Sequence, residues 1–148
     1  AQMDEQSIRL YAMSTAILNK RKSYYEILEQ TQKNDSDITD WLVWFLDTLN
    51  DSLEKTLAQI SRTLFKSQFW HKYSNLALSE EQRKVLNRLL DGGENGFEHG
   101  ISASQYQKVA KISKATATRH LSDLLEKECI VKLEGGGRNT RYQINTQL

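Results

Sequence analysis

The sequence predicts a mainly α-helical protein with two structural parts. Residues 1–91 contain no glycine, and the 148 residues contain no proline, so strong helix breakers are absent from the first part. Apolar residues recur there at spacings of three and four, which is typical of one face of a helix. Glycines divide the remainder into shorter segments. We therefore expect a helical region over residues 1–77 and a second domain over residues 78–148.

The helical region begins with a pattern that ends near residue 33. Apolar residues from Ile8 to Leu18 start a stripe, and Tyr24 and Leu28 continue the helical spacing to about Lys33. The run Asn-Asp-Ser-Asp at residues 34–37 favours turns and helix caps. A break in the helix is therefore expected there.

A long helix follows, beginning at Asp37 or Thr39. The residues of its apolar face are Leu42, Phe45, Leu46, Leu49, Leu53, Leu57, Ile60 and Leu64. A helix of this length needs a surface to pack against, either in a core or in a dimer. Trp41, Trp44, Phe69 and Trp70 add aromatic surface, which is expected in the core or against a domain outside this chain.

The second part contains two capping boxes, each of which marks the start of a helix. Ser79 precedes Gln82 by three residues and Ser102 precedes Gln105 by the same interval. In such a pair the serine hydroxyl accepts a hydrogen bond from a free backbone amide, and the glutamine reaches back to the serine amide. A helix ending at Gly92 and a second, shorter helix are expected.

A third helix and a β-hairpin complete this part. Ser113 caps the helix, and Ala117, Leu121 and Leu124 lie on its buried face. Two β-prone runs, 129–133 and 140–144, flank a glycine-rich turn. Three helices followed by a hairpin are the elements of a winged helix-turn-helix, in which the third helix reads the major groove of duplex DNA and the hairpin is the wing.

Duplex DNA is the partner that this pattern predicts. Arg119 is the candidate for a two-hydrogen-bond contact with guanine, while cations at the helix N-terminus and on the wing suit phosphate or minor-groove contacts. The candidate DNA-binding residues are Lys111, Ser113, Lys114, Thr116, Thr118, Arg119, Arg138, Asn139 and Arg141. Asp123 and Glu126 are expected on the outward face of the later turns, where they repel phosphate, so only the first two turns should enter the groove.

Composition excludes several other classes of protein. The formal net charge is only +1, so DNA affinity depends on where the cations lie. Cys129 is the only cysteine, and the three histidines show no metal-site spacing, so we expect no disulfide, catalytic residue, metal site or cofactor site. The sequence has no signal peptide and no apolar run long enough to span a membrane, which favours the cytoplasm.

The chain resembles the C-terminal part of Fic-family proteins over nearly its whole length. The matching segments are residues 9–14, 37–42, 44–46, 69–70, 82–91 and 135–138, together with Tyr142. The family transfers AMP from ATP to a target hydroxyl, and helices after its catalytic core lead into a winged helix. Its catalytic motif, His-Pro-Phe-x-x-Gly-Asn-Gly-Arg, requires a proline that this chain lacks.

The resemblance therefore implies a fragment from downstream of that motif. No family catalytic residue carries over to this chain, and ATP with a divalent metal is expected only for the missing core. The expected partners are duplex DNA and the upstream Fic catalytic domain, and the expected role is transcriptional regulation or targeting of the parent enzyme. Two alternatives stay open: a free-standing dimeric regulator with the long helix as its seam, and a domain that docks on protein.

Overall fold

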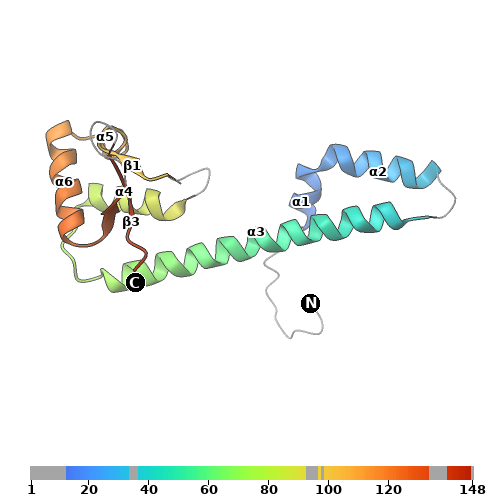
Figure 1. The fold of residues 1–148 in the computed structure, drawn as a ribbon, viewed down its shortest axis with the longest axis horizontal. Coiled ribbons are helices and arrows are strands. Elements are labelled where there is room, and N and C mark those ends of the chain that lie inside the picture. The colour runs from blue at the N-terminus through green and yellow to red at the C-terminus, as the bar shows by residue number, and fades with distance from the viewer. Residues whose placement is uncertain (1–12, 34–36, 93–96, 98, 134–139, 148) are drawn as a thin grey trace. The chain divides into compact units, whose positions relative to one another are not determined.

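The computed structural model describes residues 13–33, 37–92, 97, 99–133 and 140–147. Within these residues the protein is mainly helical, with six helices and one three-stranded antiparallel sheet (Figure 1). The mainly α class predicted from the sequence is confirmed. The chain forms two compact units that divide between Ser61 and Arg62, and each is described by itself.

The N-terminal unit consists of α1 (Met13–Asn19), α2 (Arg21–Lys33) and the first part of α3 (Thr39–Lys72). The backbone N–H of Thr39 donates to Asp37 Oδ1 at 2.9 Å, so an aspartate side chain satisfies an amide at the start of α3. The predicted long helix is therefore present, and α3 continues for 34 residues.

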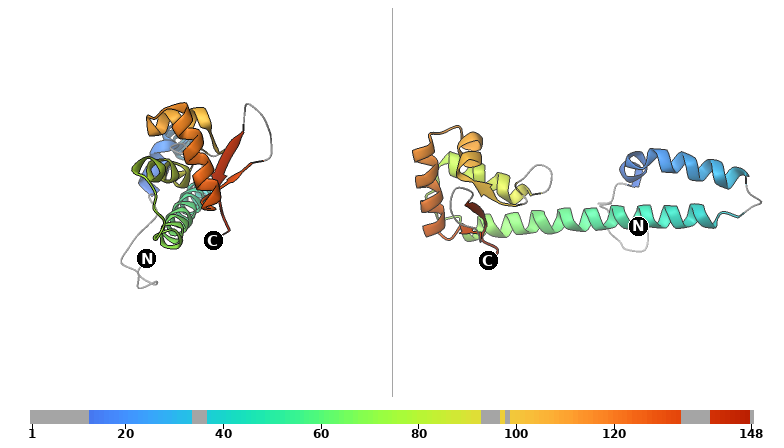
Figure 2. Two further views of the ribbon diagram at one scale, coloured as in Figure 1. Left: turned by 90° about the vertical axis from the view of Figure 1, so that its left-hand side faces the viewer. Right: turned by 45° about the horizontal axis from the view of Figure 1, so that its top comes forward.

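Contacts between α2 and α3 hold this unit together. The Trp44 ring lies 5.5 Å from the Tyr24 ring, centre to centre, and Trp44 Nε1 donates to Ser23 Oγ at 3.0 Å. Lys20, in the turn just before α2, forms an ion pair with α3 at 2.5 Å between its Nζ and Asp51 Oδ2. These contacts place α2 alongside the first part of α3, as the views in Figure 2 also show.

The C-terminal unit contains the last turns of α3 and all of the remaining elements. These are α4 (Glu80–Asp91), β1 (Ile101–Ser102), α5 (Ala103–Ala110), α6 (Lys114–Glu126), β2 (Ile130–Lys132) and β3 (Arg141–Ile144). Both predicted capping boxes form, at Ser79–Gln82 and at Ser102–Gln105. The predicted pairing of β2 with β3 is also present, with Ile130 opposite Ile144.

The strand β1 was not predicted from the sequence. It pairs with β3, with Ile101 opposite Tyr142, and the strand order is β1-β3-β2. A strand of two residues leaves no alternating pattern to detect, and Ser102 is already explained as a helix cap. Only the tertiary contact with β3 makes this segment a strand.

One hydrophobic core lies inside the C-terminal unit and draws on every helix there. Its buried residues are Phe69, Tyr73, Val85, Leu86, Leu89, Leu90, Ile101, Tyr106, Ala110, Ala117, Leu121, Leu124, Cys129, Ile130 and Ile144. Phe69 comes from α3 and Tyr73 directly follows that helix, and the Tyr73 hydroxyl donates to the Glu128 carbonyl at 2.8 Å. This is why the compact unit begins at Arg62, whereas the sequence suggested a boundary between residues 77 and 78.

The aromatic residues near the end of α3 are part of this core, as expected. Phe69 is fully buried, with the Trp70 ring against it edge to face at 5.4 Å. Trp70 Nε1 donates to Asn87 Oδ1 in α4 at 3.1 Å. No helix in the described part of the chain is both long and apolar enough to cross a membrane.

Replacing Phe69 by alanine should lower the free energy of unfolding by about 3–5 kcal/mol, because the fully buried ring leaves a cavity between α3 and α4. Urea unfolding followed by circular dichroism measures this change. The neighbouring substitution Gln68→Ala removes an exposed side chain from the same turn and should change stability by less than about 0.5 kcal/mol. Similar losses for both variants would contradict the assignment of Phe69 to the core.

Candidate nucleic-acid interface

The orientation of α6 is fixed by its buried face. Ala117 and Leu124 are fully buried and Leu121 is 2% exposed, so this side of the helix faces the core. On the other side, Lys114, Ala115, Thr118 and Arg119 are exposed. Because a helix presents residues three and four apart on one side, the burial of one face turns these polar and small residues to solvent.

The first turn of α6 carries a local network of hydroxyl groups. Ser113 Oγ accepts a hydrogen bond from the Thr116 amide at 3.2 Å and lies 2.9 Å from Thr116 Oγ1. Thr118 Oγ1 donates to the Lys114 carbonyl at 3.1 Å. Ser113, Thr116 and Thr118 therefore have structural partners in the helix, although their exposed or half-buried positions leave acceptor capacity open.

Two cations project from the first half of α6 without local neutralisation. Lys114 and Arg119 form no ion pair with any residue that the structure describes. The N-terminus of the helix adds the partial positive charge of its free amides. The positive potential and the Lys114 donor at this helix end suit an anionic group such as phosphate.

Lys111, which ends α5, has an unusual backbone conformation. Its φ and ψ are 56° and 44°, in the left-handed region, and its N–H donates to the Gln107 carbonyl. A side chain there is strained by roughly 1–2 kcal/mol, and glycine is the usual residue at such a helix end. An exposed lysine in this position is therefore kept at a cost in stability.

The predicted wing is described only in part. Arg138 and Asn139 lie outside the described residues. Arg141, on β3, donates from Nη1 to the Gly100 carbonyl at 3.0 Å and to the His99 carbonyl at 3.4 Å. This guanidinium therefore ties β3 to the chain before β1, and its role as a DNA contact stays a prediction.

Gly100 shows why the chain approaches β3 so closely at this point. Its φ is +75°, and an added Cβ would lie only 2.7 Å from the Tyr142 carbonyl oxygen. Any other residue would therefore collide with the backbone of β3 as well as being strained. The glycine lets β1 reach the sheet beside the candidate wing.

The expectation for Asp123 was wrong. Asp123 Oδ2 accepts from Gln82 Nε2 in α4 at 2.6 Å and from Lys127 Nζ at 2.7 Å, so this carboxylate faces α4. The hydrogen bond from Lys127 is the main reason that the pKa of Asp123 lies below its usual value. One of the two carboxylates expected to repel DNA is thus turned toward α4 and paired, while Glu126 is exposed.

His120 and Cys129 are both engaged inside the unit. His120 Nδ1 lies 3.1 Å from the Tyr106 hydroxyl, which joins α6 to α5, and burial raises the pKa of Tyr106. Cys129 is fully buried, and burial raises its pKa to about 11, so it packs as a small apolar thiol. Among the described residues no group of His, Cys, Asp and Glu side chains could hold a metal ion.

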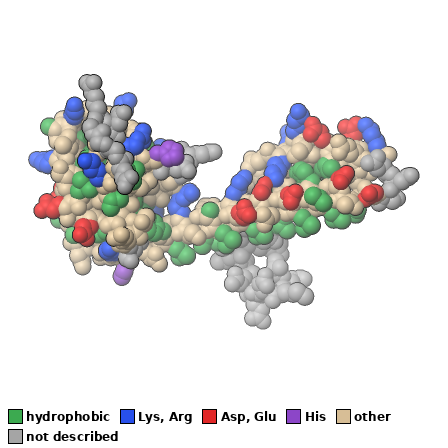
Figure 3. Space-filling model, in the orientation of Figure 1, with side chains coloured by type: hydrophobic (Ala, Val, Ile, Leu, Met, Phe, Trp, Pro, Cys, Tyr) green, Lys and Arg blue, Asp and Glu red, His purple; other side chains and the backbone are tan. Residues whose placement is uncertain are grey.

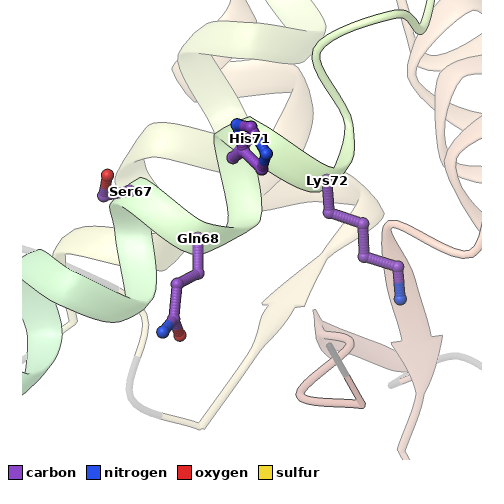
Figure 4. A pocket seen from close by; sticks show the side chains of 4 residues that line it. All are labelled: Ser67, Gln68, His71 and Lys72. Atoms are coloured by element: carbon purple, nitrogen blue, oxygen red, sulfur yellow. The ribbon is translucent and has the colours of Figure 1, made fainter.

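A shallow pocket lies against the last turns of α3. Its described lining is Ser67, Gln68, His71 and Lys72, and Lys72 Nζ donates to the Gln147 carbonyl at 2.8 Å. The four side chains point in different directions and do not converge on a common point (Figure 4). This arrangement is not that of a preformed ligand site.

Lys and Arg side chains are spread over the visible face of the C-terminal unit and form no single dense patch there (Figure 3). This distribution agrees with the low net charge of +1.

The comparisons with known proteins assign no family: no protein-family model matches the chain, and no curated protein matches it significantly.

Replacing Lys111 by glycine should raise the free energy of unfolding by about 0.5–1 kcal/mol, because glycine adopts the left-handed conformation without strain. Lys111→Ala also removes the lysine side chain but keeps a Cβ, so it should give no such gain. Chemical denaturation of the three proteins measures the difference. Equal stability of the glycine and alanine variants would show that the backbone strain is absent.

The Asp123 pair should make stability depend on acid pH. Because the folded pKa is lowered, the pair contributes fully above the unfolded value of about 3.9, and its contribution is lost as pH falls through the folded pKa. Asp123→Asn should therefore be less stable than wild type at neutral pH, with the difference shrinking below about pH 4. The effect is modest because the carboxylate is partly exposed.

Urea unfolding at neutral and acid pH tests this expectation. Glu126→Gln is the matched control, since it removes an exposed carboxylate from the same helix. A stability difference between wild type and Asp123→Asn that stays constant down to pH 3 would rule out the pair as its source.

Proposed function

We propose that the C-terminal unit is a winged helix-turn-helix domain that binds duplex DNA, with α6 as its recognition helix and the β2–β3 hairpin as its wing. The observation that carries the proposal is the two-sided character of α6. Ala117, Leu121 and Leu124 anchor one side, while Lys114 and Arg119 are exposed on the other. A helix held in this way can enter a groove without losing contact with its own core.

In this proposal the residues divide into two roles. Lys111 and Lys114 flank the N-terminus of α6, where they and the helix amides bind phosphate and fix the position of the helix. Arg119 lies more than one turn later, where its guanidinium donates two hydrogen bonds to a guanine edge. The pairing of Asp123 with Lys127 supports this arrangement, because it neutralises an acidic charge on the same helix.

We further propose that this domain belongs to a protein with a Fic-type catalytic region upstream. The sequence resemblance described above is the sole support for this part of the proposal. The parent would transfer AMP, and ATP and its metal would bind in that region. The DNA-binding unit would regulate transcription or direct the enzyme to a target near DNA. An in-frame His-Pro-Phe-x-x-Gly-Asn-Gly-Arg motif upstream of Ala1 in the coding sequence tests the relationship.

The competing function is docking on another protein. The small net charge and the engagement of Arg141 with backbone carbonyls favour this alternative. The two functions differ in salt dependence, since DNA binding releases counterions from phosphate and weakens steeply with added salt. Fluorescence anisotropy of labelled duplexes at two salt concentrations separates them. A folded chain that binds no duplex at low salt would contradict the proposal.

Arg119→Ala and Lys114→Ala should weaken DNA binding in different ways. Loss of Arg119 should cost about 1–3 kcal/mol on the preferred duplex and little on others, because a base contact is removed. Loss of Lys114 should weaken binding to every duplex and reduce the salt slope by about one, because a phosphate contact is removed.

Anisotropy titrations on a preferred and a scrambled duplex measure both effects. Lys127→Ala is the comparison variant: it also removes one positive charge, but at the far end of α6, where Lys127 pairs with Asp123. Because it also frees the Asp123 carboxylate, it should weaken binding to every duplex by no more than Lys114→Ala does, and it should leave the preference between the two duplexes unchanged. If all three variants bind every duplex alike, the division of roles is wrong.

A further inference from the structure

The structure leaves a row of apolar side chains on α3 exposed. The row consists of Leu42, Leu46, Leu49, Leu53, Leu57, Ile60 and Leu64. Leu46 is 59% exposed and Leu57 63% exposed, whereas Leu49 and Ile60 are half-buried. Hydrophobic side chains line one edge of α3 in the N-terminal unit (Figure 3). A contiguous apolar strip of this kind marks an interaction surface.

The spacing of the row has two properties that matter for a partner. The trio Leu42, Leu46 and Leu49 recurs eleven residues later as Leu53, Leu57 and Ile60. An eleven-residue repeat corresponds to about 3.67 residues per turn, close to that of a straight helix, so the row stays on one side of α3. The intervals of four and three also read the same in both directions from Leu53.

We infer that this row pairs with the same row of a second copy of the chain, with the two α3 helices antiparallel. In that arrangement Leu53 meets Leu53 of the second copy on a two-fold axis. Leu46 then lies opposite Ile60, and Leu49 opposite Leu57. Every member of the row thus faces an apolar side chain, which is the self-complementarity that a two-fold interface requires.

The charges along α3 favour the antiparallel direction. Residues 39–54 contain the four acidic residues Asp40, Asp47, Asp51 and Glu54 and no Lys or Arg. Residues 55–72 contain the four basic residues Lys55, Arg62, Lys66 and Lys72 and no Asp or Glu. Antiparallel pairing places the acidic half of each helix beside the basic half of the other, whereas parallel pairing opposes like charges.

These charges influence the relative direction of the two α3 helices more than they contribute to the contact between them. On a helical wheel they lie beside and behind the apolar row. Two of them already have partners, because Asp51 pairs with Lys20 and Lys66 pairs with Asp91. The remainder lie outside the contact and are partly screened at physiological salt, where the Debye length is about 8 Å, so they bias the orientation while the apolar row supplies the contact.

Analytical ultracentrifugation of the chain without DNA tests the dimer independently of the proposed function. We expect a concentration-dependent dimer. Leu57→Glu should raise its dissociation constant by more than about tenfold, since each copy would place a charge in the apolar contact. Leu18→Glu is the matched control, because Leu18 is 65% exposed but lies on α1, and this variant should dimerise as wild type does.

Disulfide cross-linking tests the direction. A mixture of Leu46→Cys and Ile60→Cys should form a cross-linked heterodimer, whereas Leu46→Cys alone should not, because two copies of position 46 lie far apart in the antiparallel pair. Cys129 is fully buried and adds little background. Efficient cross-linking of Leu46→Cys alone would overturn the antiparallel arrangement. A chain that stays monomeric at all concentrations, or equal weakening of the dimer by Leu18→Glu and Leu57→Glu, would contradict pairing of the row with a second copy.

Discussion

Burial of one face of α6 is the constraint on which the arrangement of the C-terminal unit depends. Leu121 and Leu124 pack in the same core as Tyr106 from α5 and Val85 and Leu86 from α4. Polar links reinforce this packing, because His120 meets the Tyr106 hydroxyl and Asp123 meets Gln82. The exposed side of α6 has no freedom to turn inward while these contacts persist. The direction in which Arg119 projects is thus a consequence of the core.

The end of α3 is held by the same core. Phe69 and Tyr73 enter the core, and the Tyr73 hydroxyl binds the Glu128 carbonyl just after α6. Glu128 itself has a left-handed φ of 55°, and its carbonyl also accepts from Asn145 Nδ2. One backbone carbonyl thus joins the end of α3, the turn after α6 and the segment after β3.

Function depends on what this core leaves outside. Lys111 and Lys114 flank the start of α6 and both are exposed, so neither side chain is part of the core. Both ammonium groups are therefore accessible to a binding partner. The apolar row of α3 is the opposite case, in which packing surface is present without a described partner. The DNA-binding proposal follows from the cations that lie outside the core. The dimer proposal follows from the leucines of α3 that no described residue covers.

The local elements follow from the amino-acid sequence alone. The two capping boxes, the cap at Ser113 and the apolar spacing of α3, α4 and α6 follow from side-chain chemistry within one or two helical turns, so they could be predicted without tertiary contacts. The pairing of the two β-prone runs followed from the glycine-rich turn between them. The exposure of Lys114 and Arg119 followed from the same helical period.

Features that join distant segments depend instead on tertiary contacts. The strand β1 exists because Gly100 allows close approach to Tyr142, and Arg141 is tied to carbonyls some forty residues earlier. Asp123 faces Gln82 because α4 packs against α6, which the helical spacing of one element cannot reveal. Phe69 and Leu64 share one helix, yet one is fully buried and the other 58% exposed. Burial depends on which neighbour covers each face, and periodicity alone does not identify that neighbour.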